Sequence, residues 1–345
     1  MRARAIDAGL LLVLAACSGG VGSSIADPEP GETVLLVTIE GIARDRLAIY
    51  GAPNMPMVVL SELAAEGRVY EGLVPAAVGA NASLASLFTG LAPEVHGVGR
   101  MRTLGGSRLA DDYETVAEVF QREGWRTVAA VSQARLSAEV SGLEQGFDAY
   151  DAPPISSGTR PRRSGDTADA LLKLVHEAVS GKEPLFAWLH LADLDEDRPA
   201  EAKWCEPWLQ RHFRALAGAD EHVAEALAGA PGEVFEALRK IPVRRRGSGV
   251  FLAWHAALHD AALERQDYAP GRVTNAPVAS GRGDDLRVIV RGVEAGDRQA
   301  PASARPRPGI LAPPVLRHRG ELAPHRALGV ARGPSVRCLL PAGPL

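Results

Sequence analysis

Two apolar runs that end next to acidic residues constrain the fold of this chain more than any other feature. Thr33–Ile39 (TVLLVTI) is rich in β-branched and aliphatic residues and is followed at once by Glu40. Leu185–Leu191 (LFAWLHL) is the second run, and an acidic cluster from Asp193 to Asp197 comes shortly after it. Continuous apolar runs of this length suit strands of a parallel sheet that is buried on both faces. Ligands of open α/β sheets bind outside the carboxyl ends of the strands, so these acids fall where a site is expected.

Segments with helical spacing and a further strand surround these two runs. The helical segments are 57–67, 82–91, 112–124 and 168–179, and the further strand is 127–132. Strands that alternate with helices predict an α/β fold with a doubly wound, mostly parallel sheet and helices on both faces.

The first residues predict export and lipid anchoring. Arg2 and Arg4 precede an apolar stretch over residues 8–16, which leads to Cys17. This layout is that of a signal peptide, and the stretch is too short to span a bilayer as a helix. Leu14-Ala15-Ala16 before the cysteine resembles the lipobox of bacterial lipoproteins. We therefore expect residues 1–17 to be a lipoprotein signal peptide with the lipid on Cys17, although an ordinary cleaved signal with an incidental cysteine is the alternative.

These features predict where the protein is located and what it contacts. Residues 18–32 are rich in Gly, Ser and Pro and are expected to form a flexible tether. The lipid on Cys17 would hold the protein to a membrane of the bacterial cell envelope, facing the periplasm or the exterior. The net charge is −4 and basic residues form no stripe, which argues against nucleic acid as a partner.

The composition changes in the last third of the chain. From Pro242 onward there is no lysine, and Arg, Pro, Ala and Gly dominate. Residues 286–293 (LRVIVRGV) are the main exception to a lack of periodicity. We therefore predict an α/β domain over 33–240, incomplete at its C-terminal end, and a tail over 241–345. Such a tail would be poorly ordered, or the product of a coding sequence read in a shifted frame.

Ordered sequence blocks over residues 33–199 carry a family resemblance. The blocks are ETVLLVTIEGIARDRLAIYG, SELAAEGRVYEGLVPAA, SLASLFTGLAPEVHGV, ETVAEVFQREGWRTVAAVS, GLEQGFDAYD and FAWLHLADLDEDRP. Together they resemble the amino-terminal half of the sulfatase and alkaline phosphatase-like superfamily. The resemblance implies the alkaline phosphatase-like fold and a hydrolase of sulfate or phosphate esters that uses one or two divalent metals, such as Ca²⁺, Mg²⁺, Mn²⁺ or Zn²⁺.

The positions that the resemblance assigns to catalysis depart from the family pattern. The family has a metal-binding Asp at the end of the first strand, where this chain has Glu40. A Cys, Ser or Thr nucleophile stands before the TG block in the family, and Ala80 takes that position here. Formylglycine, which is made from Cys or Ser, cannot form at Ala80. The family's Pro-His pair aligns with Leu194-Asp195, and the later Asp-His-Gly metal motif is missing from the sequence.

Several other residues are candidates for a role near this site. Ser83 lies one helical turn after Ala80 and is a substitute nucleophile or, more simply, a residue that caps or packs the helix. Asp45 belongs to the matching motif with a structural role expected, and His96 is expected to brace the turn after the helix. His190 lies on an apolar strand, where a histidine is more often satisfied within the core than a ligand. The cluster of Asp193, Asp195 and Asp197 is either a cation site, for example for Ca²⁺, or a solvated loop.

Three functional hypotheses remain open on the sequence. The first is a sulfatase-like lipoprotein whose catalytic site is impaired and which binds anionic glycans or other envelope components. The second is an active metal-dependent ester hydrolase or transferase with a rearranged site that uses Glu40, with Ser83 and the Asp193–Asp197 cluster as further candidates. The third is a truncated gene product without function.

Overall fold

The parallel sheet predicted from the apolar runs forms the centre of the protein. The structure is a computed structural model, which describes residues 31–42, 47–52, 57–70, 73, 75–77, 79–99, 108–157, 160–178, 183–192, 201–218, 220–241, 248–279, 286–293 and 329–332. The strands are β1 (Thr33–Ile39), β2 (Arg126–Val131), β3 (Ala149–Asp151), β4 (Leu185–Leu191), β5 (Leu286–Gly292) and β6 (Gly329–Arg332). Their order in the sheet is β3-β2-β4-β1-β5-β6, and all neighbours are parallel except β5 and β6.

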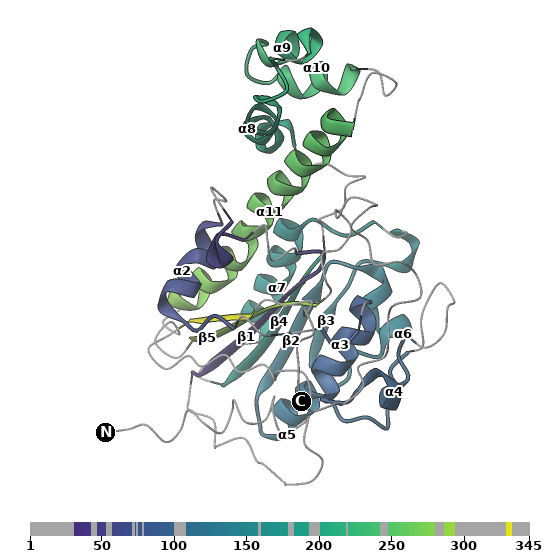
Figure 1. Ribbon diagram of the computed structural model, residues 1–345. Helices are drawn as coiled ribbons and strands as arrows, with labels where there is room; N and C mark the ends of the chain where they lie inside the picture. The colour runs from purple at the N-terminus through teal and green to yellow at the C-terminus, as the bar shows by residue number, and fades with distance from the viewer. Residues whose placement is uncertain are drawn as a thin grey trace, which may run out of the picture.

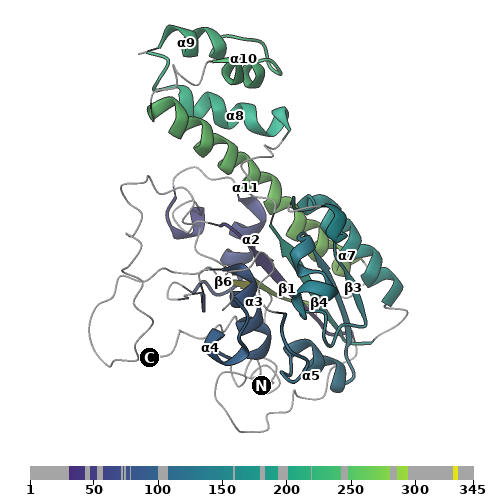
Figure 2. The same cartoon turned by 90° about the vertical axis from the view of Figure 1, so that its right-hand side faces the viewer.

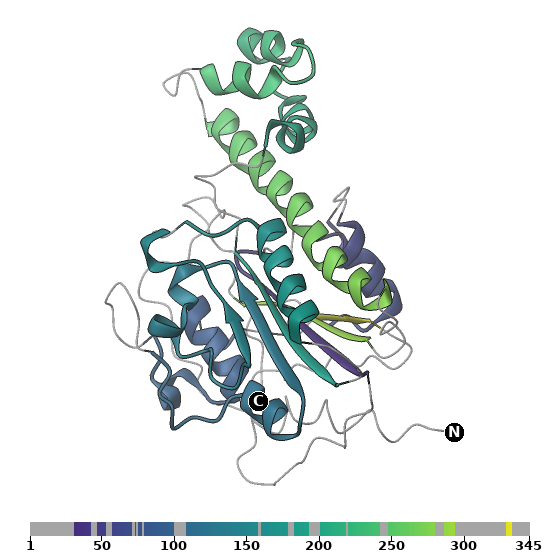
Figure 3. The same cartoon turned by 180° about the vertical axis from the view of Figure 1, so that it is seen from behind.

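Helices cover both faces of this sheet, as the sequence predicts (Figure 1). Helices α3 (Ala80–Thr89) and α5 (Val116–Arg122) lie on one face, with the short helices α4 (Pro93–His96) and α6 (Ala138–Ser141) at the same side. Helices α2 (Val58–Glu66), α7 (Ser164–Ala178) and α11 (Ser248–Ala279) lie on the other face (Figure 3). The short 3₁₀ helices are η2 (Ala48–Tyr50), η3 (Ala134–Leu136) and η4 (Ile155–Ser157).

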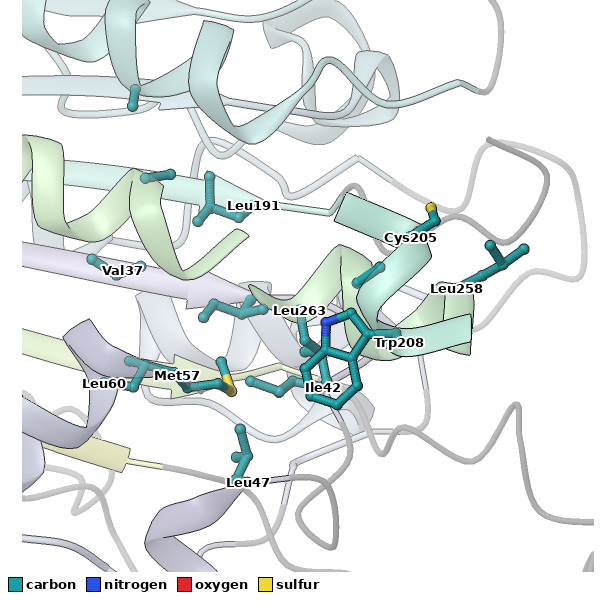
Figure 4. Packing of buried hydrophobic residues seen from close by; sticks show 14 of the residues in the cluster. Val37, Ile42, Leu47, Met57, Leu60, Leu191, Cys205, Trp208, Leu258 and Leu263 are labelled. Atoms are coloured by element: carbon teal, nitrogen blue, oxygen red, sulfur yellow. The ribbon is translucent and has the colours of Figure 1, made fainter. Parts of the chain in front are cut away.

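Alternation along β1 divides its side chains between two cores. Leu35, Val37 and Ile39 belong to the core with α2, α7 and α11, part of which is drawn in Figure 4. Val34 and Leu36 belong to the core with α3 and α5. Successive side chains of a strand point to opposite faces, so a strand that is apolar at every position is buried on both sides.

A group of helices extends beyond the carboxyl ends of the strands. Helices α8 (Ala202–Phe213), α9 (Glu221–Leu227) and α10 (Val234–Lys240) lie around the first half of α11 (Figure 2). Their buried residues, including Trp208 and Phe235, continue the core of the α2 face. None of the helices in the described part of the chain is long and apolar enough to cross a membrane.

The predicted domain boundary at residue 240 is too early. Helix α11 and strand β5 lie inside the stretch expected to be a poorly ordered tail, yet β5 pairs with the central strand β1 along its whole length. Ala257, Ala261 and Ala269 of α11 are buried, and small apolar residues give little contrast in a periodicity pattern. The periodicity of the sequence therefore does not predict this helix.

Several of the predicted segments lie outside the residues that the structure describes. The signal peptide, Cys17 and the tether over 18–32 lie outside the described residues, apart from the end of the tether at Gly31 and Glu32. Residues 294–328 and 333–345 of the expected tail also lie outside them.

A carboxylate from α11 ties it to α2. The Oδ2 atom of Asp267 accepts a hydrogen bond from the Val59 amide at 2.8 Å, and its Oδ1 atom accepts one from the Leu60 amide at 3.0 Å. These amides belong to the first turn of α2, whose N–H groups have no partner within the helix. Burial raises the pKa of Asp267 to about 6, although the two amide bonds act to lower it.

Replacing Asp267 tests whether α11 belongs to the folded unit. We expect Asp267→Ala to lower the free energy of unfolding by about 1–2 kcal/mol, the usual cost of losing an N-terminal cap. Leu252→Ala, at a half-exposed position of α11, is the matched control and should change it by less than about 0.5 kcal/mol. Urea denaturation measures both. Equal stability of the two variants would contradict the packing of α11 described here.

Candidate active site

A row of polar side chains runs along the α3 face of the sheet towards the ends of β1 and β4. Thr38 and Glu40 lie two residues apart and therefore share a face, as do Trp188 and His190. The parallel register places Thr38 of β1 beside His190 of β4. Thr38 and His190 are fully buried and Glu40 is buried, so each polar atom in this row needs a partner.

The hydrogen bonds of this row have a fixed direction. Trp188 donates its indole N–H to Thr38 Oγ1 at 2.9 Å. Thr38 Oγ1 lies 2.8 Å from His190 Nδ1, and His190 Nε2 lies 2.8 Å from Glu40 Oε1. Burial lowers the pKa of His190 although Glu40 acts to raise it, so the ring is neutral at pH 7. A carboxylate only accepts, so Nε2 carries the proton and Nδ1 accepts from the Thr38 hydroxyl.

Arg135 completes the environment of the Glu40 carboxylate. The residue lies in η3, just after β2, and its Nη2 atom donates to both oxygens of Glu40. Its Nη1 atom donates to Oδ1 of Asn81, in the first turn of α3. Burial acts to raise the pKa of Glu40, but the charge of Arg135 and the hydrogen bond from His190 outweigh it and hold the pKa below its usual value. The carboxylate is therefore ionised and paired.

The start of α3 lies beside this ion pair. Ala80, which the resemblance aligns with the nucleophile, is the first residue of the helix and is buried. Ser83 is buried as well, and its Oγ atom donates to the Ala77 carbonyl at 2.8 Å and accepts from the Ala77 amide at 3.2 Å. Its hydroxyl thus holds the loop before the helix, and attack on a substrate would require breaking both bonds.

His96, the last residue of α4, contacts the other end of α3. Its Nε2 atom lies 2.9 Å from Ser86 Oγ, and its Nδ1 atom accepts from the Val98 amide at 3.1 Å. Burial lowers the pKa of His96, which keeps the ring neutral with Nε2 as the donor. His96 therefore links the last turn of α3 to the turn that follows α4. Asp45, Asp193, Asp195 and Asp197 lie outside the described residues, so their predicted roles stay predictions.

The residues around Glu40 do not fit a divalent cation in this arrangement. Both Glu40 oxygens accept from Arg135, and both ring nitrogens of His190 are engaged in hydrogen bonds. Across the described ranges, no group of three or more His, Cys, Asp or Glu side chains could hold a metal ion. Sequence reasoning missed Arg135, because this residue lies three positions beyond Ser132, the end of one matching block, and belongs to none of the blocks.

Thr38 joins the two halves of the polar row, so its hydroxyl can be tested directly. We expect Thr38→Val to lower the free energy of unfolding by about 2 kcal/mol, because the Trp188 indole and His190 Nδ1 would lose a partner in a buried place. Thr38→Ser keeps the hydroxyl and should cost less. Chemical denaturation of both variants measures the difference. A valine variant at least as stable as the serine variant would contradict the directed hydrogen-bond row.

The fold and sequence of this domain match known proteins. The family model "Sulfatase" matches residues 32–196. No curated protein matches the chain in sequence. One solved structure, a complex with its substrate D-glucosamine-2-N,6-O-disulfate, is 13% identical with a TM-score of 0.60, covering 89% of this chain and 72% of that one.

Two further solved structures agree with this result. A protein of the alkaline phosphatase superfamily from Vibrio parahaemolyticus is 14% identical with a TM-score of 0.53, covering 95% of this chain and 68% of that one. A phosphonate monoester hydrolase from Agrobacterium radiobacter is 16% identical with a TM-score of 0.51, covering 88% of this chain and 68% of that one. At these identities the likeness shows the fold. With the family match, it follows that residues 32–196 of this chain belong to the sulfatase and alkaline phosphatase-like superfamily.

Proposed function

We propose that this chain is a lipid-anchored protein of the sulfatase family that binds anionic glycans or other envelope components without cleaving their esters. The observation that carries the proposal is Ala80 at the first position of α3. A methyl group has no atom that can attack sulfur or phosphorus, so the covalent route of the family is closed at this position.

The residues around Ala80 supply no simple replacement for the missing nucleophile. Ser83 holds the Ala77 backbone through two hydrogen bonds, and Glu40 is paired with Arg135. An active variant of the family mechanism would need one of these groups to leave its partner. The arrangement therefore favours the impaired member over the hydrolase with a rearranged site.

The binding half of the proposal rests on charge and on the neighbouring structures. Arg135, whose side chain is 36% exposed, donates to the Asn81 side chain in the first turn of α3. A guanidinium and a helix N-terminus both favour an anionic group. One neighbour was solved with a disulfated glucosamine and another with neocarrahexaose. A sulfated glycan is accordingly the class of ligand that we propose for this chain.

Hydrolysis assays test the impaired site. With p-nitrophenyl sulfate or p-nitrophenyl phosphate and Ca²⁺, Mg²⁺, Mn²⁺ or Zn²⁺, we expect no turnover above the buffer. Ser83→Ala and Glu40→Gln are the matched variants, and neither should change this result. Release of p-nitrophenol by the wild type that either variant abolishes would show a live site and end the proposal.

A binding assay tests the ligand class. We expect the chain to bind immobilised heparin, and to bind desulfated heparin about tenfold more weakly, because the sulfate charges are lost. Arg135→Gln should weaken the binding to heparin, while Arg122→Gln on the exposed surface of α5 should not. Equal affinity for both heparins, or no binding, would contradict the proposed ligand.

Membrane fractionation tests the anchor. In a bacterial host that processes lipoproteins, we expect the wild type in the membrane pellet and Cys17→Ala in the supernatant. The reason is that each buried acyl CH₂ contributes about 0.8 kcal/mol to membrane binding. Wild type in the supernatant, or a variant that stays in the pellet, would contradict anchoring through Cys17.

A further inference from the structure

The guanidinium of Arg135 connects the elements that carry the candidate active site. It reaches from η3, after β2, to the carboxylate that follows β1, and its other end reaches Asn81 in α3. In the sheet, β4 lies between β2 and β1, so the side chain crosses above the strand that holds His190. A positive charge of the chain itself therefore lies against Glu40, the residue expected to bind a metal.

We propose that Arg135 is a built-in cation that takes the place of the divalent metal and makes the fold of this protein independent of metal ions. The resemblance to sulfatases implies a divalent metal at Glu40, and the residues described around this carboxylate do not fit one. The inference depends on membership of the superfamily, and it goes beyond the proposed absence of ester cleavage.

The hydrogen bonds that Glu40 accepts support the replacement of a metal ion by Arg135. Oε1 accepts from His190 and Arg135, and Oε2 accepts from Arg135. The proton on His190 Nε2 points at Glu40, so that nitrogen has no lone pair to offer. A divalent ion would have to displace the guanidinium and would be repelled by its charge if both remained.

The arginine is held in place by packing on either side of it. Ala134 and Leu136 are buried. The Leu136 carbonyl accepts from the Tyr150 hydroxyl at 2.7 Å and from the Ser141 hydroxyl at 3.0 Å. The fixed backbone of η3 limits where the side chain can reach, and the contacts with Asn81 and Glu40 orient the guanidinium.

Thermal melting with and without cations tests the proposal on the full chain. We expect the melting temperature of the wild type to be unchanged by Ca²⁺, Mg²⁺, Mn²⁺ or Zn²⁺. Arg135→Ala leaves the buried Glu40 charge unpaired and should melt roughly 5 °C lower. At least one of the cations should then raise its melting temperature, because a ligand that binds the folded state stabilises it.

Two further variants distinguish a specific replacement of the metal by Arg135 from a general loss of stability in Arg135→Ala. Arg135→Ala combined with Glu40→Gln removes both charges, and its melting temperature should recover and not respond to cations. Arg162→Ala breaks a different ion pair, with Asp151, and should not gain a cation response. If Arg135→Ala does not fold, Arg135→Lys, which keeps the charge, should fold and ignore all four cations.

Three results would overturn the proposal. The first is a wild type that is stabilised by a cation and loses this effect in Glu40→Gln. The second is an Arg135→Ala variant that melts like the wild type. The third is an Arg135→Ala variant that melts lower and gains no cation response. Because melting is measured rather than turnover, failure here is distinct from failure of the hydrolysis prediction.

Discussion

Backbone pairing of β1 with β4 on one side and β5 on the other is the constraint on which the rest of the structure depends. It buries an apolar strand on both faces, so helices must cover both sides of the sheet. The same register sets Thr38 next to His190 and so aligns the row that ends at Glu40. The candidate site is thus a consequence of the way in which the central strands pair.

A buried carboxylate needs a counter-charge, and this chain supplies it from within. Removing Glu40 from water costs several kcal/mol, which the charge of Arg135 and the hydrogen bond from His190 offset. We propose that this pairing takes the place of the metal that the family resemblance implies. The same contact brings a positive charge to the start of α3, where Ala80 has no atom to attack an ester. These features carry the proposal that the site binds an anion without the covalent chemistry of the family.

Much of the fold could be predicted from the sequence because its signals are local. Apolar runs in the sequence predict β1, β4 and β2, and helical spacing predicts α2, α3, α5 and α7. The satisfied histidine expected at position 190 is confirmed by hydrogen bonds at both ring nitrogens. The end of the domain was placed too early, because α11 packs largely through alanine and β5 follows a stretch of unusual composition.

The site was harder to predict than the fold, because its partners are far apart in the chain. Glu40 was singled out as a strand-end acid, but its pairing with Arg135 joins residues 95 positions apart and follows no spacing rule. The hydrogen bond of Thr38 with His190 depends on a strand register that two separate apolar runs do not specify. Only three-dimensional packing brings these groups together.

The ¹⁵N NMR spectrum of the His190 ring tests the central claim most directly. With ¹⁵N-labelled histidine and His190→Gln to assign the signal, the account predicts a neutral ring with the proton on Nε2, and the same spectrum after addition of Zn²⁺. The pair of the buried Glu40 with Arg135 would then be intact and closed to metal. A proton on Nδ1, or a His190 signal that shifts on Zn²⁺ addition, would contradict it, because Nε2 would then be free to bind a metal.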